Sequence, residues 1–432
     1  MITAVRLWWL LTRHEQSTSR LPTVLAVTAF AVAGGSLLVV LGGVHAMFRR
    51  WAADPSSELG SLYLTLAVVA AALMVIPILT LGGQAARLTL ARRNHRLAAL
   101  RLAGATTGQA ATITVAETTA QALAGSVIGT ALYGLTLPVL TLISFEGRPL
   151  QLAELWLGPG LLLAGLAAVV GLALVSATVS LGTVAVTPLG VASRVTPKRL
   201  TVLRAVVVVA MMCAWPLVLM IMPMLGVILF GLGLVAVVNL FGPWLVMLFG
   251  MILGGLARRA PTLLAARRIV DDPRTAWRSA SAFALVIMLA TGSAWASHAG
   301  VVSGEATLSS DMSTGALITL VIVSVVAATS SGVVHACRVI DNQSLHRSMV
   351  LAGTEVSVLS ATRLREVAWP LAVTTVTAGG FAALLMMPLG YEVPVALARF
   401  AVAVGGSAVL TLLALWASHP LLVRSVQQPS AG

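Results

Sequence analysis

The chain has 432 residues, of which 58% are hydrophobic and only 9% are charged, with a mean hydropathy of +0.98. These proportions exclude an ordinary soluble domain, and recurring apolar runs of about 20 residues indicate transmembrane helices rather than a membrane barrel. The net charge of +13 suggests nucleic acid only in a soluble protein; here basic cytoplasmic loops account for it, so we expect a lipid bilayer and no nucleic acid as partner.

The N-terminal residues 1–21 predict a helix that lies in the inner headgroup region, because Trp8 and Trp9 are flanked by arginines. Apolar runs bounded by charged or turn residues then predict about ten transmembrane helices. These runs are 22–46, 61–83, 108–137, 156–186, 202–222, 226–253, 277–298, 314–337, 364–388 and 395–418.

The distribution of charge predicts the orientation. With both termini in the cytoplasm, 23 of the 27 Lys and Arg residues lie on the inner side, as the positive-inside rule requires. The outer loops collect acidic residues instead and are short, the longest being near 299–313. We therefore expect a multi-pass protein of a bacterial cytoplasmic membrane. Since Lys198 is the only lysine, a GC-rich genome is the favoured source.

A weak internal duplication has an offset of 249 residues. The run Leu100–Gly104 is echoed by Met349–Gly353, and Glu117 and Glu366 each follow thirteen residues after the glycine. Six predicted spans separate the two loops, so both lie on one face and the repeats are parallel. The expected fold is an all-α integral membrane protein with two parallel four-helix repeats joined by two linking helices. The interfacial N-terminal helix is 1–21, the first repeat is 22–195, the two linking helices are 196–260, and the second repeat is 261–432.

The repeated loops, 84–107 and 338–363, are candidates for docking a partner, although lipid headgroup contact also explains one basic loop alone. Glycine at the end of each short helix lets the chain turn at positive φ. Glu117 and Glu366 are expected to pair with arginines at the inner interface. The candidate docking residues are Arg92, Arg93, Arg96, Leu97, Leu100, Arg101 and Gly104 in the first loop, and His346, Arg347, Leu351 and Gly353 in the second.

No enzyme motif is found in the chain. Lys198 does not follow a glycine-rich turn, no pair of histidines has zinc-binding spacing, and there is no Gly-x-Ser-x-Gly motif. We therefore predict no catalytic residue, metal site or cofactor on this chain, and no substrate-binding residue can be assigned.

The run from Arg92 to Thr106, followed by Glu117, resembles the signature of FtsX-like permeases, the type VII group of ABC transporters. The run Val350–Thr354 with Glu366 resembles a degenerate second copy, and Arg267-Arg268 with Asp272-Pro273 is similar to the usual entry to the second domain. The resemblance implies a permease subunit with two copies of a separate ABC ATPase that binds ATP and Mg. The ten-span layout is similar to that of the bacitracin-resistance permeases, without their large extracellular domain, and an arginine stands at position 96 where the family commonly has an acidic residue.

The resulting expectation is ATP-driven export or extraction of a hydrophobic or amphipathic substrate, such as an antimicrobial peptide, a lipid or a drug. One alternative is a regulator that conveys the state of the ATPase to a cell-wall hydrolase or a sensor kinase. The short outer loops argue against a hydrolase, and docking of a sensor kinase through the spans stays open. The other alternative is an ion-driven secondary transporter, which charged residues near the bilayer centre would favour, and the near absence of such residues counts against it.

Overall fold

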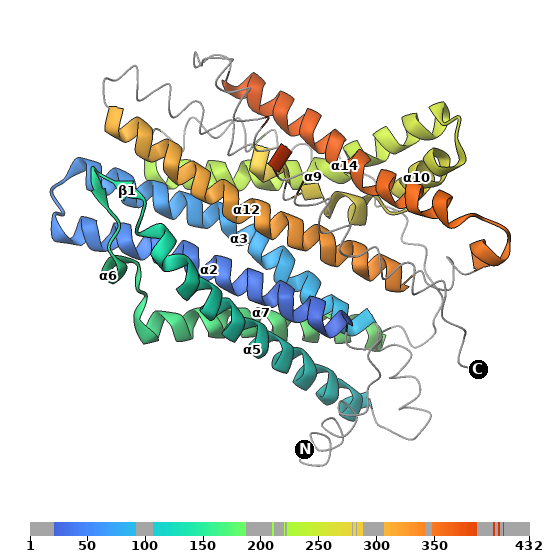
Figure 1. The fold of residues 1–432 in the computed structure, drawn as a ribbon, viewed down its shortest axis with the longest axis horizontal. Helices are drawn as coiled ribbons and strands as arrows, with labels where there is room; N and C mark the ends of the chain where they lie inside the picture. The colour runs from blue at the N-terminus through green and yellow to red at the C-terminus, as the bar shows by residue number, and fades with distance from the viewer. Residues whose placement is uncertain are drawn as a thin grey trace.

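The fold is known from a computed structural model of the whole chain. Most of the helices in the described part of the chain are long and lie side by side (Figure 1). The residues that the structure describes are 21–91, 107–186, 210, 220, 223–278, 280–281, 283–287, 306–341, 348–386, 401, 405–406 and 409.

Long helices make up nearly all of the described chain. They are α2 (Leu21–Ala53), α3 (Glu58–Ala91), α5 (Thr107–Leu140), α7 (Gly158–Val186), α9 (Pro223–Leu256), α12 (Ala306–Asp341) and α14 (Val356–Met386). Six of them, all except α14, contain a stretch that is long and apolar enough to cross a membrane. The described part of the chain is therefore that of a helical, membrane-embedded protein.

These helices are longer than a bilayer requires. A helix of 34 residues, such as α3 or α5, extends for about 51 Å, whereas the hydrocarbon core is about 30 Å thick. The ends of the helices therefore reach the headgroup zones, where charged side chains find water and polar partners.

The described helices pack in two groups (Figure 1). In the first, α2 lies against α3 and α5, α7 covers α5 and α3, and α12 lies along α3 and α2. Contact between α2 and α5 is close because small residues face each other: a Cβ at Gly129 would lie 2.7 Å from the carbonyl oxygen of Ala31. In the second group, α10 (Ala260–Asp271) and α14 pack with α9.

The two ends of the first group differ in their connections (Figure 1). One end, which we call the hairpin end, carries the α2–α3 turn, the start of α12, strands β1 (Ser144–Phe145) and β2 (Arg148–Pro149), and the short helix α6 (Leu152–Leu155). The strands are antiparallel, with Phe145 opposite Arg148. The other end, the loop end, carries the last residues of α3 and α12 and the first residues of α5 and α14.

Four helices overlap when one half of the chain is shifted onto the other by 249 residues. The shift brings α3 (Glu58–Ala91) onto α12 (Ala306–Asp341) and α5 (Thr107–Leu140) onto α14 (Val356–Met386). Helices α3 and α12 also pack against each other.

The sequence-based spans need one correction and leave some positions open. Residues 306–313, expected in an outer loop, form the first turns of α12, because Tyr63 and a backbone amide of the hairpin bind Asp311 there. Helices α2, α3, α5, α7, α9, α12 and α14 overlap their predicted spans. The N-terminal helix of 1–21 and the spans 202–222, 277–298 and 395–418 lie wholly or mostly outside the described residues.

Candidate functional site

The candidate docking residues of the first loop are not among the described residues, and the part of that loop that is described, 84–91, is not a loop but the last turns of α3. Arg92, Arg93, Arg96, Leu97, Leu100, Arg101 and Gly104 all lie outside the described residues, as do His346 and Arg347 of the second loop. Leu351, Gly353, Glu117 and Glu366 are described, and they lie toward the loop end.

Gly353 ends the short helical turn before α14 with a Schellman motif. Its φ is +89°, its amide donates to the carbonyl of Val350 at 3.0 Å, and the amide of Thr354 donates to Met349 at 2.9 Å. Glycine suits this position because a Cβ would strain a backbone with positive φ. The turn leaves the Leu351 side chain 80% exposed.

Glu366 forms an ion pair with an arginine, as the sequence predicted. Its Oε1 accepts a hydrogen bond from Nη1 of Arg268 at 3.0 Å, and the Glu366 side chain is only 6% exposed. The second guanidinium nitrogen of Arg268 lies 3.9 Å from the sulfur of Met349, in the turn before Gly353. We call these three residues the Arg268 bridge, since it joins α10, α14 and the candidate docking loop.

Helix α10 positions Arg268. The helix is short and amphipathic, and it buries Ala265, Ala266 and Ile269. Pro261 lies in its first turn. After its last residue, the Asp272 carboxylate accepts a hydrogen bond from the amide of Thr275 at 3.1 Å. Arg268 is therefore held with its neighbours against α14, while Arg267 points to the exposed side.

The corresponding glutamate of the first half has a different described partner. Glu117, half-buried on α5, accepts a hydrogen bond from Nε2 of Gln121, one helical turn away, at 3.3 Å. The two glutamates are thus equivalent in sequence position, and an ion pair with Arg268 is described for Glu366.

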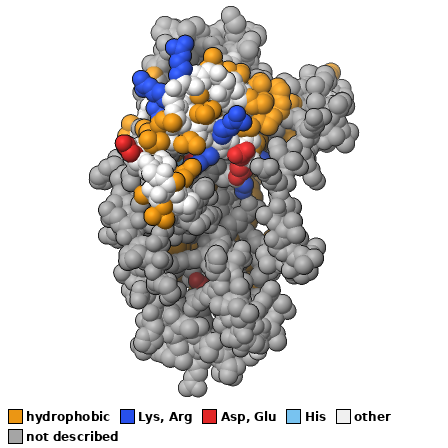
Figure 2. Space-filling view, turned by 90° about the vertical axis from the view of Figure 1, so that its right-hand side faces the viewer, with side chains coloured by type: hydrophobic (Ala, Val, Ile, Leu, Met, Phe, Trp, Pro, Cys, Tyr) orange, Lys and Arg blue, Asp and Glu red, His pale blue; other side chains and the backbone are white. Residues whose placement is uncertain are grey.

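Figure 2 views the molecule from the loop end, where arginine side chains and a smaller number of acidic ones lie among hydrophobic side chains in the described part of the face. We call this patch the loop-end surface. Its exposed members are Arg258, Arg259, Leu263, Arg267, Leu351 and Leu364. A mixture of apolar and basic side chains of this kind is suited to binding a protein partner.

At the hairpin end, one buried arginine holds several segments together. The Arg50 side chain is 2% exposed and binds Oε2 of Glu154 through Nε at 3.1 Å and Nη2 at 2.9 Å. It also donates to the carbonyls of Phe145 at 2.8 Å and Pro149 at 3.1 Å, and lies 3.6 Å from Glu146. We call this set the Arg50 network. It fastens the hairpin and α6 to the end of α2.

Further bonds close the same end. His45 donates from Nδ1 to the carbonyl of Glu154 at 2.9 Å, Arg49 donates to Ala153 at 3.0 Å, and the Tyr133 hydroxyl donates to Leu155. Burial raises the pKa of the Glu154 carboxyl, but the Arg50 hydrogen bonds, the Gln151 amide and the Arg50 and Arg148 charges outweigh it and hold the pKa below 4.5.

Two hydrogen bonds join α3 to α12. Near the hairpin end, the Tyr63 hydroxyl donates to Oδ2 of Asp311 at 2.7 Å, and the amide of Glu146 donates to the same oxygen at 2.7 Å. Toward the loop end, the Ser330 hydroxyl donates to Oε1 of Gln84 at 2.8 Å. All four side chains are buried, so these bonds fix α3 against α12 at two well-separated levels.

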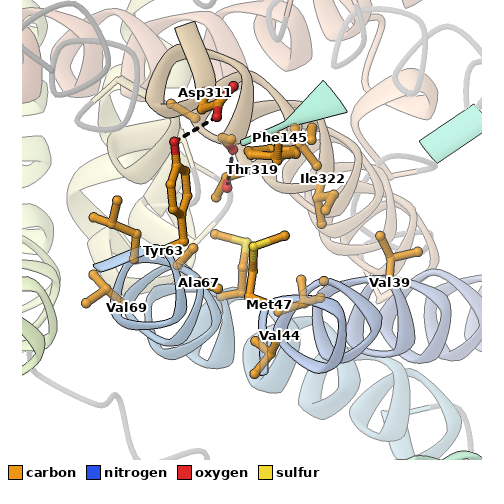
Figure 3. Close-up of a pocket in the computed structure, with 18 of the residues that line it drawn as sticks. Val39, Val44, Met47, Tyr63, Ala67, Val69, Phe145, Asp311, Thr319 and Ile322 are labelled. Carbon is orange, nitrogen blue, oxygen red and sulfur yellow. Dashed lines mark hydrogen bonds between the residues drawn. The ribbon is translucent and has the colours of Figure 1, made fainter. Parts of the chain in front are cut away.

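A cavity of about 330 Å³ lies between α2, α3 and α12, below the hairpin (Figure 3). Apolar side chains such as Val44, Met47, Ala67 and Ile322 form most of its wall. The polar side chains in the described wall are Tyr63, Asp311 and Thr319, and it contains no Lys, Arg or His. The cavity is therefore an apolar space with one carboxylate at its edge.

Sequence reasoning missed the hairpin-end features because each depends on residues far apart in the chain. Arg50, Glu146, Glu154 and Asp311 could be assigned to outer loops by charge alone, but not to one another. The Glu146-Gly147 pair, with φ of 57° and 73°, forms a two-residue turn, and it was the one local signal for the hairpin.

The fold and these sites define a helical membrane protein with a polar clamp at one end and a basic-apolar surface at the other. Comparison with protein-family models, curated proteins and solved structures finds no match for the chain. Among the described residues, no group of three or more His, Cys, Asp or Glu is arranged to hold a metal ion.

Proposed function

We propose that this chain is the membrane subunit of an ATP-driven transporter of the FtsX-like type. It would couple a separate ATPase, present in two copies and carrying the ATP and Mg, to export or extraction of a hydrophobic or amphipathic substrate. The loops 84–107 and 338–363 would each dock one ATPase.

The observation that carries the proposal is the Arg268 bridge. A partner that displaces the turn before Gly353 also acts on Met349, and Arg268 links Met349 to Glu366 on α14. Movement of the docking loop is thereby passed to a helix of the bundle. The exposed Leu351 and the arginines of the loop-end surface offer contacts for such a partner.

Two further observations support a two-lobed permease. Helices α3 and α5 overlap α12 and α14 when shifted by 249 residues, the offset of the weak sequence duplication. The ends of α3 and α12 also lie together at the loop end, so both candidate docking loops leave the bundle on one face (Figure 1). In the orientation favoured by the positive-inside rule, that face is cytoplasmic.

A substrate of hydrophobic or amphipathic character is supported by the cavity between α2, α3 and α12. Its wall is almost wholly apolar and it lies within the apolar stretches of these helices, so it suits a molecule that reaches it from the bilayer. A lipid or a hydrophobic drug fits this description, whereas a whole antimicrobial peptide is too large for a cavity of about 330 Å³.

The test is affinity purification of the tagged chain from its native membrane, followed by an ATPase assay and identification of co-purifying proteins. We expect a stoichiometric ATPase that is lost when Arg92, Arg93 and Arg347 are changed together to Glu. Arg148→Glu, at the hairpin end, is the matched control and is expected to retain the ATPase. Recovery of the chain alone, without nucleotide hydrolysis, would overturn the proposal and favour a gradient-driven transporter.

A further inference from the structure

Asp311 is the most unusual group in the described wall of the cavity. The residue is only 6% exposed, and it lies within an apolar membrane span. Both of its hydrogen bonds, from the Tyr63 hydroxyl and the Glu146 amide, fall on Oδ2. Burying a carboxylate is costly unless its charge is balanced, so a charged side chain here calls for a functional explanation.

No described cation balances this carboxylate. The nearest described arginine network is that of Arg50, whose donors are directed to Glu154, Phe145 and Pro149. The described residues that line the cavity include no basic side chain. The two neutral donors on Oδ2 leave Oδ1 without a hydrogen bond from the described part of the chain.

Figure 3 shows how the rest of the cavity complements this carboxylate. Asp311 and Tyr63 lie together at one edge, and the side chains of Val44, Met47 and Ala67 surround the space beside them. The site therefore offers one negatively charged hydrogen-bond acceptor, the Asp311 carboxylate, beside an apolar cavity. A volume of about 330 Å³ is at the lower end of the range for small-molecule pockets, which excludes a large folded peptide.

From this combination we propose that the cavity binds a small amphipathic amine, with its protonated amino group at Asp311 and its hydrocarbon part among the apolar side chains. The proposal rests on the proposed function in that it names the substrate class of the same membrane subunit. A charged donor adds a charge-assisted hydrogen bond and neutralises a buried carboxylate, whereas a neutral or anionic headgroup does neither.

A simple structural role for Asp311 makes a different prediction. If Asp311 served only to accept the hydrogen bonds from Tyr63 and the Glu146 amide, an asparagine at this position would serve equally well, because its side-chain carbonyl oxygen accepts the same two bonds. Asp311→Asn therefore preserves the link between α3, α12 and the hairpin but removes the negative charge. Preference for a cationic headgroup separates the two roles.

The experiment measures binding of tritiated dodecylamine to the isolated chain in phosphatidylcholine nanodiscs, with empty nanodiscs subtracted. Dodecanol and dodecanoate, which have the same hydrocarbon chain, serve as competitors. We expect saturable binding of dodecylamine, with dodecanol weaker by about tenfold or more because it lacks the charge, and dodecanoate weaker still because its charge is repelled.

Four variants complete the test. Asp311→Asn should abolish the preference for dodecylamine over dodecanol, whereas Asp54→Asn, an exposed acidic residue of the α2–α3 turn, should retain it. Ala67→Phe should fill the cavity and weaken binding of both ligands, whereas Val75→Phe, on the exposed side of α3, should not. If dodecanol competes as well as unlabelled dodecylamine, the cavity recognises only the hydrocarbon chain, and the proposal is overturned.

Retention of the amine preference by Asp311→Asn, or absence of saturable binding to the chain, would overturn it equally. Because the assay contains no ATPase, its outcome is independent of whether an ATPase co-purifies. If the chain binds the amine but no ATPase co-purifies, the binding site is supported and the ATP-driven permease is rejected. If an ATPase co-purifies but the amine does not bind, the permease is supported and the amine as substrate class is rejected.

Discussion

The hairpin end and the loop end each contain a buried glutamate–arginine pair, but the surroundings of the two arginines differ. Arg50 is 2% exposed and directs its donors to one carboxylate and two backbone carbonyls. Arg268 is 26% exposed and contacts one carboxylate and the weakly accepting sulfur of Met349. The first arrangement fixes a connection permanently, whereas the second joins a loop to a helix by contacts that can be exchanged at modest cost.

The largest effect is expected from Arg50→Ala. The substitution removes the four hydrogen bonds by which Arg50 holds the hairpin and α6, and it leaves Glu154 without Arg50. We expect the free energy of unfolding to fall by about 3–5 kcal/mol, measured by thermal unfolding in detergent. The control, Arg148→Ala, removes a side chain that is 55% exposed and should cost less than about 1 kcal/mol. Equal losses would contradict the assignment of Arg50 as the clamp.

A smaller loss is expected from Arg268→Ala. Glu366 then keeps its buried position without its guanidinium partner, at a cost of about 1–3 kcal/mol in the free energy of unfolding. Adding Glu366→Gln should recover part of the loss, because the neutral amide needs no cation. The exposed neighbour Arg267→Ala should have little effect. A double variant that is less stable than Arg268→Ala alone would show that the ion pair is not the source of the loss.

The hairpin end should also respond to acid. Because the pKa of Glu154 is held below 4.5 in the folded protein, its contribution to stability is present above pH 4.5 and is lost as the pH falls through the lowered value. Melting temperatures measured from neutral pH to about pH 3 should therefore drop less for Glu154→Gln than for the wild type. Parallel pH profiles for the two proteins would refute this assignment.

The smallest expected effect concerns the loop end. Gly353→Ala introduces a Cβ at a φ of +89°, and we expect a loss of about 1 kcal/mol in the free energy of unfolding. Gly353→Asn should lose less, because asparagine tolerates this region. Gly255→Ala, in α9 where nothing lies within 4 Å of the added Cβ, is the matched control and should not destabilise the protein. An equally well tolerated Gly353→Ala would contradict the Schellman turn.

Hydrophobic run length predicted most of the helices. Spans such as 61–83 and 108–137 lie inside α3 (Glu58–Ala91) and α5 (Thr107–Leu140), because some twenty apolar residues have no other stable arrangement in a bilayer. The start of α12 could not be predicted in this way. Residues 306–313 are polar enough to resemble a loop, and it is the partners of Asp311 that make a helical start stable.

The ion pairs show the same limit. An arginine partner for Glu366 was predicted from the arginines beside it in sequence, Arg363 and Arg365. The charge of Arg363 does act on Glu366, but the hydrogen-bonded ion pair described for Glu366 is with Arg268, 98 residues away, because α10 packs on α14. Composition shows that a buried glutamate needs a cation, but only the packing of helices determines which cation is near. For the candidate docking residues of 92–104, the prediction stands as it was made.

The two hydrogen bonds between α3 and α12 limit how the halves of the molecule can move. Tyr63 and Gln84 are 21 residues apart, so the bonds to Asp311 and Ser330 are separated by about 32 Å along the helix. Sliding one helix past the other by a single turn, about 5.4 Å, would break both bonds at once. Tilting the helices apart at either level would break one. The two helices therefore keep a fixed axial register as long as both bonds are made, and any large movement of one against the other has to break at least one of them.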